Sequence, residues 1–266
     1  MVAHERILSR NVIQLNDVWA SYDSKTHVLR GVSLSVARGS NYAIIGQSGS
    51  GKSSLLRLIN GMMAPARGRV MVDYVRPGQN NREFRRMMPQ IGYIPQGLGL
   101  VDNLTVLGNA LIGALPRTGR IKSMLGEFPE AEVEAARRIL GMVGLGSKSD
   151  RKAHMLSGGE RRRVAIARAL VQRPEVLLAD EMVSELDRST ATEIMDLVRD
   201  AQERFGLTAV MVHHDVGLAL EYADRVAMIK EGRKELEIGV EGDRIVDFES
   251  SGLSQEEILE MYGREP

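Results

Sequence analysis

Runs of apolar residues alternate along the chain with amphipathic segments, and this pattern predicts an α/β fold. The continuous apolar runs Tyr42–Ile45 and Val176–Ala179 predict strands that are buried on both faces. The alternation of Val32, Leu34 and Val36 predicts a strand with one buried face. Further strands are expected at residues 12–19, 69–73, from 91 to the break at Pro95, 208–212, 225–229, 234–240 and 244–248.

Helical periodicity recurs between these strands. In residues 54–63, apolar side chains are spaced three or four positions apart, as on one face of a helix. Residues 130–142 carry a single apolar stripe. Other helices are expected from Asn103 or Thr105 to Ile112, from Ser157 to about Val171, at 189–205 and at 255–262. Residues 80–90 and 117–129 are polar and basic, and we expect a surface excursion and an irregular joint there.

Composition narrows the possible classes of protein. The 266 residues carry 35 basic and 35 acidic side chains, a balance that argues against a large nucleic-acid interface. The absence of Cys excludes disulfides and cysteine metal sites and fits a cytoplasmic protein. Residues 1–10 are charged and do not resemble a signal peptide, and no apolar stretch is long enough to predict a membrane span. Any membrane crossing would therefore have to be supplied by other chains.

The segment from Gly46 to Ser53 has the pattern G-x-x-x-x-G-K-S of a phosphate-binding loop. It follows the predicted strand 42–45 and precedes the predicted helix, which is the context that this motif requires. Its glycines allow backbone N–H groups to face phosphate oxygens, and the helix dipole adds to the attraction. Lys52 would contact the β- and γ-phosphates, and the Ser53 hydroxyl is placed for Mg²⁺.

Two carboxylates follow the buried strand 176–179. Asp180 can hold Mg²⁺ directly or through water, and Glu181 can act as the base for attack of water on the γ-phosphate. A solvated acidic loop is the alternative, and the phosphate loop upstream argues against it.

Three further polar sites have both a functional and a structural interpretation. Tyr22 can stack on an adenine ring or pack on the core as a strand-end aromatic. Gln96, just past a predicted strand, can reach Mg²⁺ or the attacking water, or it is a solvated loop residue. One of His213 and His214 can sense the γ-phosphate, although a lone His is more often structural, and the pair with Asp215 also suggests a metal site.

A second anion site is expected at Ser157-Gly158-Gly159-Glu160, where Ser157 caps a helix N-terminus. The run Arg161–Arg163 within this helix is expected to be a solvated face. The apolar, glycine-rich loop 97–101 is a candidate protein contact, with a buried loop as the alternative.

Together these motifs resemble the nucleotide-binding subunit of ABC transporters over residues 11–248. Leu156–Glu160 is similar to the family's signature sequence, Gly46–Ser53 to Walker A and Val176–Asp180 to Walker B. The resemblance implies that Glu181 is the catalytic glutamate, Gln96 the Q-loop residue and His214 the switch histidine, and that Ser184–Asp187 is the D-loop. It also favours stacking for Tyr22 and implies ATP and Mg²⁺ as cofactors. The implied nucleotide-binding residues are Tyr22, Gly46, Gln47, Ser48, Gly49, Ser50, Gly51, Lys52, Ser53, Ser54, Ser157, Gly158, Gly159 and Glu160, and the implied metal ligands are Ser53, Gln96 and Asp180.

The resemblance also implies an architecture. We expect an α/β, RecA-like P-loop NTPase core (residues 11–96 and 156–240) with an N-terminal antiparallel β subdomain, an inserted α-helical subdomain at 97–155 and a C-terminal helical tail at 249–266. The chain departs from the family at Met182, where Pro is usual, at Glu185, where Ala is usual, and at Glu160, where Gln is frequent.

Partners follow from the family as well. Two such subunits pair head to tail, each ATP lying between Walker A of one and the signature of the other, on integral permease subunits at the cytoplasmic face of the membrane. Residues 100–106 and the ending Leu259–Gly263 are similar to the phosphonate-import ATPases, whose transporters also use a secreted binding protein. Alternatives are an ATPase accessory of a soluble phosphonate-metabolism complex and an exporter ATPase, and the short 97–155 segment argues against a DNA-maintenance ATPase.

Overall fold

The computed structural model describes residues 11–23, 26–78, 80–118, 127–241 and 244–248. Its internal contacts divide the chain into two compact units. The first unit comprises residues 1–88, 179–181 and 207–266, and the second comprises residues 89–178 and 182–206. The predicted C-terminal helix at 255–262 and tail at 249–266 lie outside the described residues.

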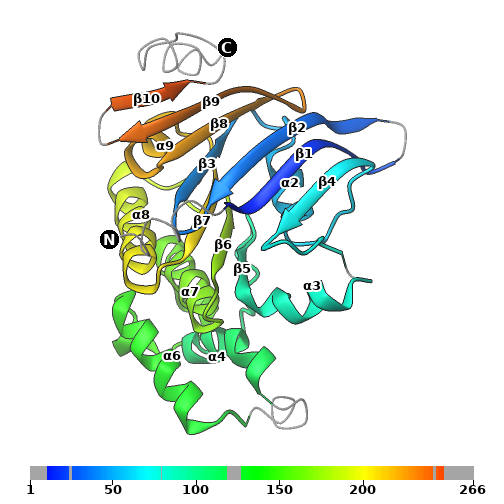
Figure 1. Cartoon of the computed structure of the whole chain (residues 1–266). Helices are drawn as coiled ribbons and strands as arrows, with labels where there is room; N and C mark the ends of the chain where they lie inside the picture. Colours follow the sequence, from blue (N-terminus) through cyan, green and yellow to red (C-terminus); the bar gives the residue numbers. More distant parts are fainter. Residues whose placement is uncertain (1–10, 24–25, 79, 119–126, 242–243, 249–266) are drawn as a thin grey trace, which may run out of the picture. The chain divides into compact units, whose positions relative to one another are not determined.

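The first unit contains an antiparallel sheet in the order β2-β1-β4 (Figure 1). Its strands are β1 (Asn11–Ser21), β2 (His27–Ala37) and β4 (Arg67–Val72). Leu15 of β1 is paired with Leu34 on one side and with Val70 on the other, and all three side chains are buried. Alternating residues of these strands therefore form one apolar face, as the sequence pattern predicts.

The second sheet of this unit brings the carboxyl ends of two parallel strands side by side. It contains β3 (Asn41–Ile45), β7 (Thr208–His213), β8 (Arg225–Lys230), β9 (Arg233–Glu241) and β10 (Arg244–Phe248), in the order β10-β9-β8-β3-β7. The end of β6 (Val176–Asp180) also belongs to this unit. Strand β3 runs parallel to β7 and β8, and every residue of β3 and β7 is buried. The carboxyl ends of β3 and β7, Ile45 and His213, are therefore paired.

Three helices complete the described part of the first unit. Helix α2 (Lys52–Ile59) follows β3, α3 (Arg82–Met87) precedes the second unit, and α9 (Val216–Tyr222) packs in a buried cluster with β3, β8 and β9. The prediction that the first helix reaches residue 63 is wrong, because Gly61 adopts φ 72° and ends it. The segment 80–90 is largely exposed, as expected for a surface excursion, but it contains the unexpected helix α3, which Asn81 caps and whose Phe84 is buried. Helix α9 was not expected.

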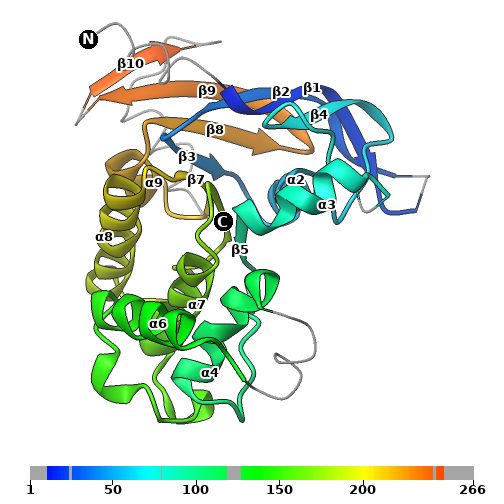
Figure 2. The ribbon, with the colours of Figure 1, turned by 60° about the horizontal axis from the view of Figure 1, so that its bottom comes forward.

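The second unit is mainly helical. It holds β5 (Ile91–Ile94) beside the start of β6, and the helices α4 (Val106–Leu111), α6 (Glu130–Met142), α7 (Gly158–Val171) and α8 (Arg188–Phe205). The 3₁₀ segments η2 (Ile112–Arg117), η3 (Gly146–Lys148) and η4 (Ala153–Met155) connect them. Helices α4, α6 and α7 lie side by side in Figures 1 and 2. At Gly113 an added Cβ would lie 2.1 Å from the carbonyl oxygen of Arg168, so η2 and α7 pack backbone to backbone.

Candidate functional site

The loop between β3 and α2 can exist only with glycine at its two ends. Gly46 has φ 151°, and a Cβ there would lie 2.1 Å from the carbonyl oxygen of Ile229. Gly51 has φ 109°, and its Cβ would lie 2.8 Å from the carbonyl oxygen of Val28. Any larger residue would displace the loop, since real Cβ atoms do not approach backbone so closely. The loop backbone is thus held against β2 and β8, on the end of β3.

The start of α2 presents donors that an anion would satisfy. Its N-cap, Gly51, has no side chain to bond the first N–H groups of the helix. Among the described residues, the Ser50 hydroxyl is buried with no hydrogen-bond partner. Buried hydroxyl groups are nearly always paired, so this one indicates a partner that comes from outside the chain. A phosphate group fits both features, because helix N-termini bind anions.

Lys52 places its positive charge inside this loop. Its Nζ donates to the carbonyl oxygens of Gly46, at 2.7 Å, and Gln47, at 2.9 Å. Burial lowers the pKa of Lys52, and the charges of Glu181 and Asp180 oppose that shift. The ammonium is therefore near both carboxylates, at the place where a bound phosphate chain would add negative charge.

Ser53 and Asp180 form a pair of oxygen ligands suited to Mg²⁺. Ser53 Oγ donates to Asp180 Oδ1 at 2.9 Å, and Asp180 is only 4% exposed at the end of β6. Burial raises the pKa of Asp180, while the hydrogen bond from Ser53 opposes the shift. The described residues contain no cluster of three or more His, Asp or Glu side chains that could hold a metal. A hydroxyl with one carboxylate matches Mg²⁺, which commonly takes its remaining ligands from water and substrate phosphates.

Glu181 and His214 lie in contact. His214 Nε2 is 2.5 Å from Glu181 Oε1, and the Glu181 side chain is 12% exposed against 41% for His214. Glu181 also adopts a left-handed backbone conformation with φ 52°. Such conformations cost about 1–3 kcal/mol and concentrate at functional sites. A carboxylate and a His that follow two different strand ends are thus in contact in the fold.

The neighbouring His213 has a different environment. Its ring is buried, and neither ring nitrogen has a hydrogen-bond partner among the described residues. Burial lowers the pKa of His213 to about 4, so the ring is neutral at pH 7. The residue pattern alone left both histidines open, and the family resemblance implied His214; in the structure it is His214 that contacts Glu181.

Tyr22 stands beside α2 with its ring exposed. The ring is 58% exposed, and the hydroxyl lies 3.0 Å from Ser54 Oγ and accepts a hydrogen bond from Arg57 at 2.9 Å. The Arg57 guanidinium lies 5.8 Å from the ring centroid. The core-packing alternative is therefore wrong, and Arg57 is a site neighbour that the sequence analysis missed. A basic residue in the last turn of a helix, such as Arg57 in α2, is not by itself a sequence signal for a functional site.

In the second unit, Ser157 and Glu160 form a capping box at the start of α7. Ser157 Oγ accepts from the Glu160 N–H at 3.3 Å, and Glu160 Oε2 accepts from the Ser157 N–H at 2.9 Å. Glu160 also pairs with Lys148, and the hydrogen bond from Lys148 is the largest cause of its lowered pKa. Gly159 packs closely, because a Cβ there would lie 3.1 Å from Thr190 Cγ2. Gln96 is exposed and follows Pro95, the first residue after β5.

The expected solvated face at Arg161–Arg163 is wrong, because each arginine binds a different part of the second unit. Arg161 pairs with Asp102, and Arg163 donates to the carbonyl oxygen of Val143 and pairs with Glu193. Arg162 donates to the carbonyl oxygens of Met182 and Ser184. Adjacent residues of a helix point in different directions, and three arginines can therefore reach three separate segments.

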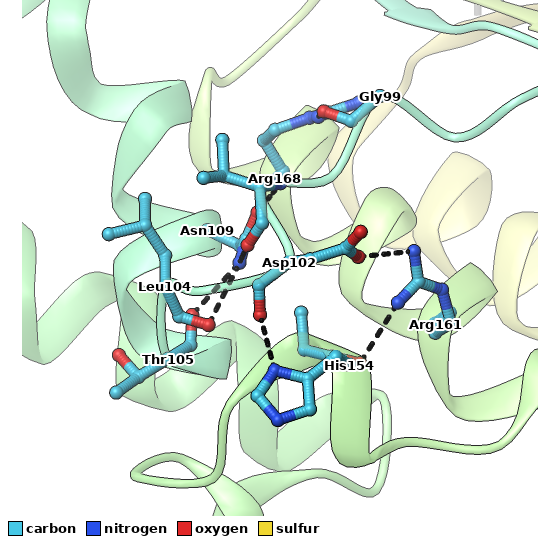
Figure 3. Close-up of polar contacts among 10 residues, drawn as sticks. Gly99, Asp102, Leu104, Thr105, Asn109, His154, Arg161 and Arg168 are labelled. Carbon is cyan, nitrogen blue, oxygen red and sulfur yellow. Dashed lines mark hydrogen bonds and ion pairs between the residues drawn. The ribbon is translucent and has the colours of Figure 1, made fainter.

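The loop 97–101 is partly buried and firmly held. Leu98 is buried, Leu100 is half-buried and Val101 is 47% exposed. Figure 3 shows Arg168 donating to the carbonyl oxygen of Gly99, and the Asn109 side chain bonding the backbone at Leu104 and Thr105. The figure also shows the pair of Asp102 with Arg161, and His154 Nδ1 at 3.1 Å from the Asp102 carbonyl oxygen. The loop therefore keeps one exposed apolar residue on a rigid backbone.

Comparison with known proteins gives consistent matches. The profile of the family described as ABC transporter matches residues 29–184. The chain is 38% identical over 262 residues to the phosphonates import ATP-binding protein PhnC of Bordetella parapertussis, covering 95% of this chain and 97% of that protein. It is 36% identical over 255 residues to PhnC 2 of Synechococcus sp., covering 96% and 91% respectively.

A solved structure shares the fold. The dimeric structure of an ATP-binding cassette in a post-hydrolysis state, bound to ADP and Pi, superimposes with a TM-score of 0.75 at 32% identity, over 86% of this chain and 99% of that chain. This likeness confirms the expected fold class of an α/β P-loop core with an antiparallel subdomain. No helix in the described ranges is both long and apolar enough to cross a membrane.

Proposed function

We propose that this chain, which belongs to the ABC transporter family and is an ATP-binding and ATP-hydrolysing subunit of it, energises the import of phosphonate or a related phosphorus oxyanion. One observation carries the site assignment: Lys52, Ser53, Asp180 and Glu181 converge at one phosphate loop. The importer assignment is supported by the phosphonate-import relatives, which align over nearly the whole chain.

The phosphates of ATP would bind at the loop Gly46–Ser54. The uncapped start of α2 and the Ser50 hydroxyl offer donors, and Lys52 offers the positive charge. Tyr22, exposed beside Ser54, would stack on the base. The base is thereby held by its flat face, so this contact does not distinguish adenine from guanine.

The pair Ser53 and Asp180 would hold Mg²⁺. Bound there, Mg²⁺ would neutralise charge on the phosphate oxygens. Burial raises the pKa of Asp180, because a buried carboxylate is costly to keep charged when no cation is near. This cost favours the binding of a cation beside Asp180. Lys52 adds a second positive charge on the same side of the loop.

Hydrolysis would begin with removal of a proton from water by Glu181. The carboxylate is largely shielded from solvent, and its Oε1 is fixed by the hydrogen bond with His214 Nε2. Through this hydrogen bond, His214 would keep Glu181 in one orientation. As a separate role, His214 would contact the γ-phosphate. A shielded, oriented base near Lys52 is what in-line attack on a phosphate requires.

A second copy of the chain would complete each site. In this proposal the residues Ser157, Gly158, Gly159 and Glu160 at the start of α7 would contact the nucleotide of the second copy, and dimeric cassettes of similar fold are known. We further propose integral permease subunits and a secreted binding protein as partners, at the cytoplasmic face of the membrane. The exposed Val101 on the held loop 97–101 is the proposed permease contact.

The test is transport by the assembled complex. The chain would be reconstituted in vesicles with candidate permease and binding-protein partners, and uptake of methylphosphonate, phosphate and sulfate would be measured with ATP on the side of this chain. ATP-dependent uptake of a phosphorus compound and exclusion of sulfate would support the proposal. Vesicles that hydrolyse ATP but take up neither phosphorus compound would refute the importer assignment, and vesicles containing Glu181→Gln serve as the control for energisation.

A further inference from the structure

The turn that follows Glu181 is strained at both ends. Glu181 has φ 52° and Glu185 has φ 64°, and both residues carry side chains that disfavour the left-handed region. Between them lie Met182, Val183 and Ser184. Strained backbone persists only where the surrounding structure holds it in place. The contacts that hold this turn are therefore of functional interest.

Arg162 is placed to hold it. Its Nε donates to the carbonyl oxygen of Met182 at 2.7 Å, and its second terminal nitrogen donates to that of Ser184 at 2.5 Å. The other terminal nitrogen reaches the carbonyl oxygen of Gly158 at 3.4 Å. A guanidinium presents its donors in a rigid planar fork, and it can bridge two carbonyl groups at fixed spacing in a way that Lys cannot.

The charges around Arg162 agree with this role. Burial lowers the pKa of Arg162, and the charge of Glu185 opposes that shift. Glu185, which belongs to the turn, thus provides a negative charge for the Arg162 guanidinium. Met182 and Val183 are buried as well, so the turn has apolar anchors that do not depend on Arg162. Removing the guanidinium should therefore loosen the turn without unfolding the unit.

We propose that Arg162 is a positioning residue for hydrolysis, which holds the turn 182–185 in its strained conformation and, through the peptide chain at Met182, limits the orientations of Glu181. The inference rests on the proposed function, because it requires Glu181 to be the base. Arg162 itself touches neither nucleotide nor water in this proposal.

The neighbouring Arg163 supplies a matched control. It lies on the same helix and also bonds one backbone carbonyl, that of Val143 at 3.1 Å, but it pairs with Glu193 rather than with the 182–185 turn. Loss of Arg163 should therefore destabilise the second unit to a similar extent and leave the turn in place.

The experiment measures ATP hydrolysis and thermal melting for the full chain and the variants Arg162→Ala, Arg162→Lys, Arg163→Ala and Glu181→Gln. We expect kcat of Arg162→Ala to fall between about tenfold and a hundredfold, with KM for ATP within about twofold, since small misplacement of a reacting group costs that much. The kcat of Arg162→Lys should lie between that of the unmodified chain and that of Arg162→Ala. Arg163→Ala should keep kcat within about twofold of the unmodified chain, with a melting temperature similar to that of Arg162→Ala.

The outcomes separate the two proposals. Equal kcat values for Arg162→Ala and Arg163→Ala, or a rise in KM with unchanged kcat, would overturn the role of Arg162 while Glu181→Gln remained slow. Normal hydrolysis by Glu181→Gln would instead overturn the assignment of the base. If Arg162→Ala does not fold, the same comparison is made with Arg162→Lys, which keeps the aliphatic stem and one donor.

Discussion

Replacing Glu181 by Gln tests the centre of the proposed chemistry with a minimal change of shape. The amide keeps one oxygen where the carboxylate contacts His214, and the backbone at φ 52° is unchanged. Only the negative charge and the basicity are lost. A general base contributes about a hundredfold to ten-thousandfold to the rate, which corresponds to about 2.7–5.4 kcal/mol of transition-state stabilisation.

Folding should change much less than the rate. One hydrogen bond is weakened rather than removed, which costs on the order of 1 kcal/mol. Lys52 would lose one of its two neighbouring carboxylates but keep Asp180 and its two backbone acceptors. ATP affinity should therefore stay within about threefold, since one neutralised acid also reduces repulsion of the phosphates.

The assay combines single-turnover hydrolysis with size-exclusion chromatography. Glu181→Gln should bind ATP, hydrolyse it at least about a hundredfold more slowly and accumulate as an ATP-bound dimer. The control is Glu203→Gln, an exposed residue of α8, which should behave as the unmodified chain. Normal turnover together with a monomer in ATP would refute Glu181 as the base.

Four further changes test other parts of the site. Lys52→Ala should abolish ATP binding or turnover, and unchanged hydrolysis would remove the loop from the mechanism. Tyr22→Ala should weaken nucleotide binding by about 1–3 kcal/mol in a titration, with GTP affected equally, and no loss would return Tyr22 to a structural role. Because unfolded His protonates near pH 6.5 and folded His213 only near 4, the unfolding free energy should decline by about 3 kcal/mol as pH falls through that range. In urea titrations His213→Leu should lack this decline, and parallel curves for both proteins would contradict the reasoning. Val101→Asp should leave ATPase of the isolated chain near normal and stop uptake in the assembled complex. Phe205→Asp, which changes another exposed apolar residue, should leave both ATPase and uptake near normal. Equal loss of both activities in Val101→Asp would indicate misfolding.

Local signals predicted much of the fold. Strands β3, β6 and β7 are continuous apolar runs, and the helix caps at Thr105, Ser157 and Asp187 are small polar residues directly before apolar periodicity. Helix α3 was missed because four of its six residues are charged and only Phe84 and Met87 are buried. Its one local signal was Asn81, a good N-cap residue, and that signal was outweighed by composition.

Long-range contacts could not be predicted in this way. The arginines at 161, 162 and 168 bond residues 102, 182 and 98, which are separated from them by about 20 to 70 positions in the sequence. A run of arginines on a helix has the same composition whether it is solvated or bonded, so the sequence could not distinguish these cases. The local pattern likewise did not distinguish His213, the buried last residue of β7, from His214, and the choice of His214 came from the family resemblance.

The ion pair of Glu160 with Lys148 makes two distant positions interdependent. Glu160 adds a negative charge at a helix end where a triphosphate is proposed to bind, and Lys148 cancels it through the pair. A glutamine at position 160 could keep the contact with the Ser157 N–H without bringing any charge, and a lysine at 148 would then have no acid to balance. In an alignment of close relatives, an acidic residue at position 160 should therefore occur together with a basic residue at position 148. Relatives in which residue 160 is uncharged should also have replaced the basic residue at 148.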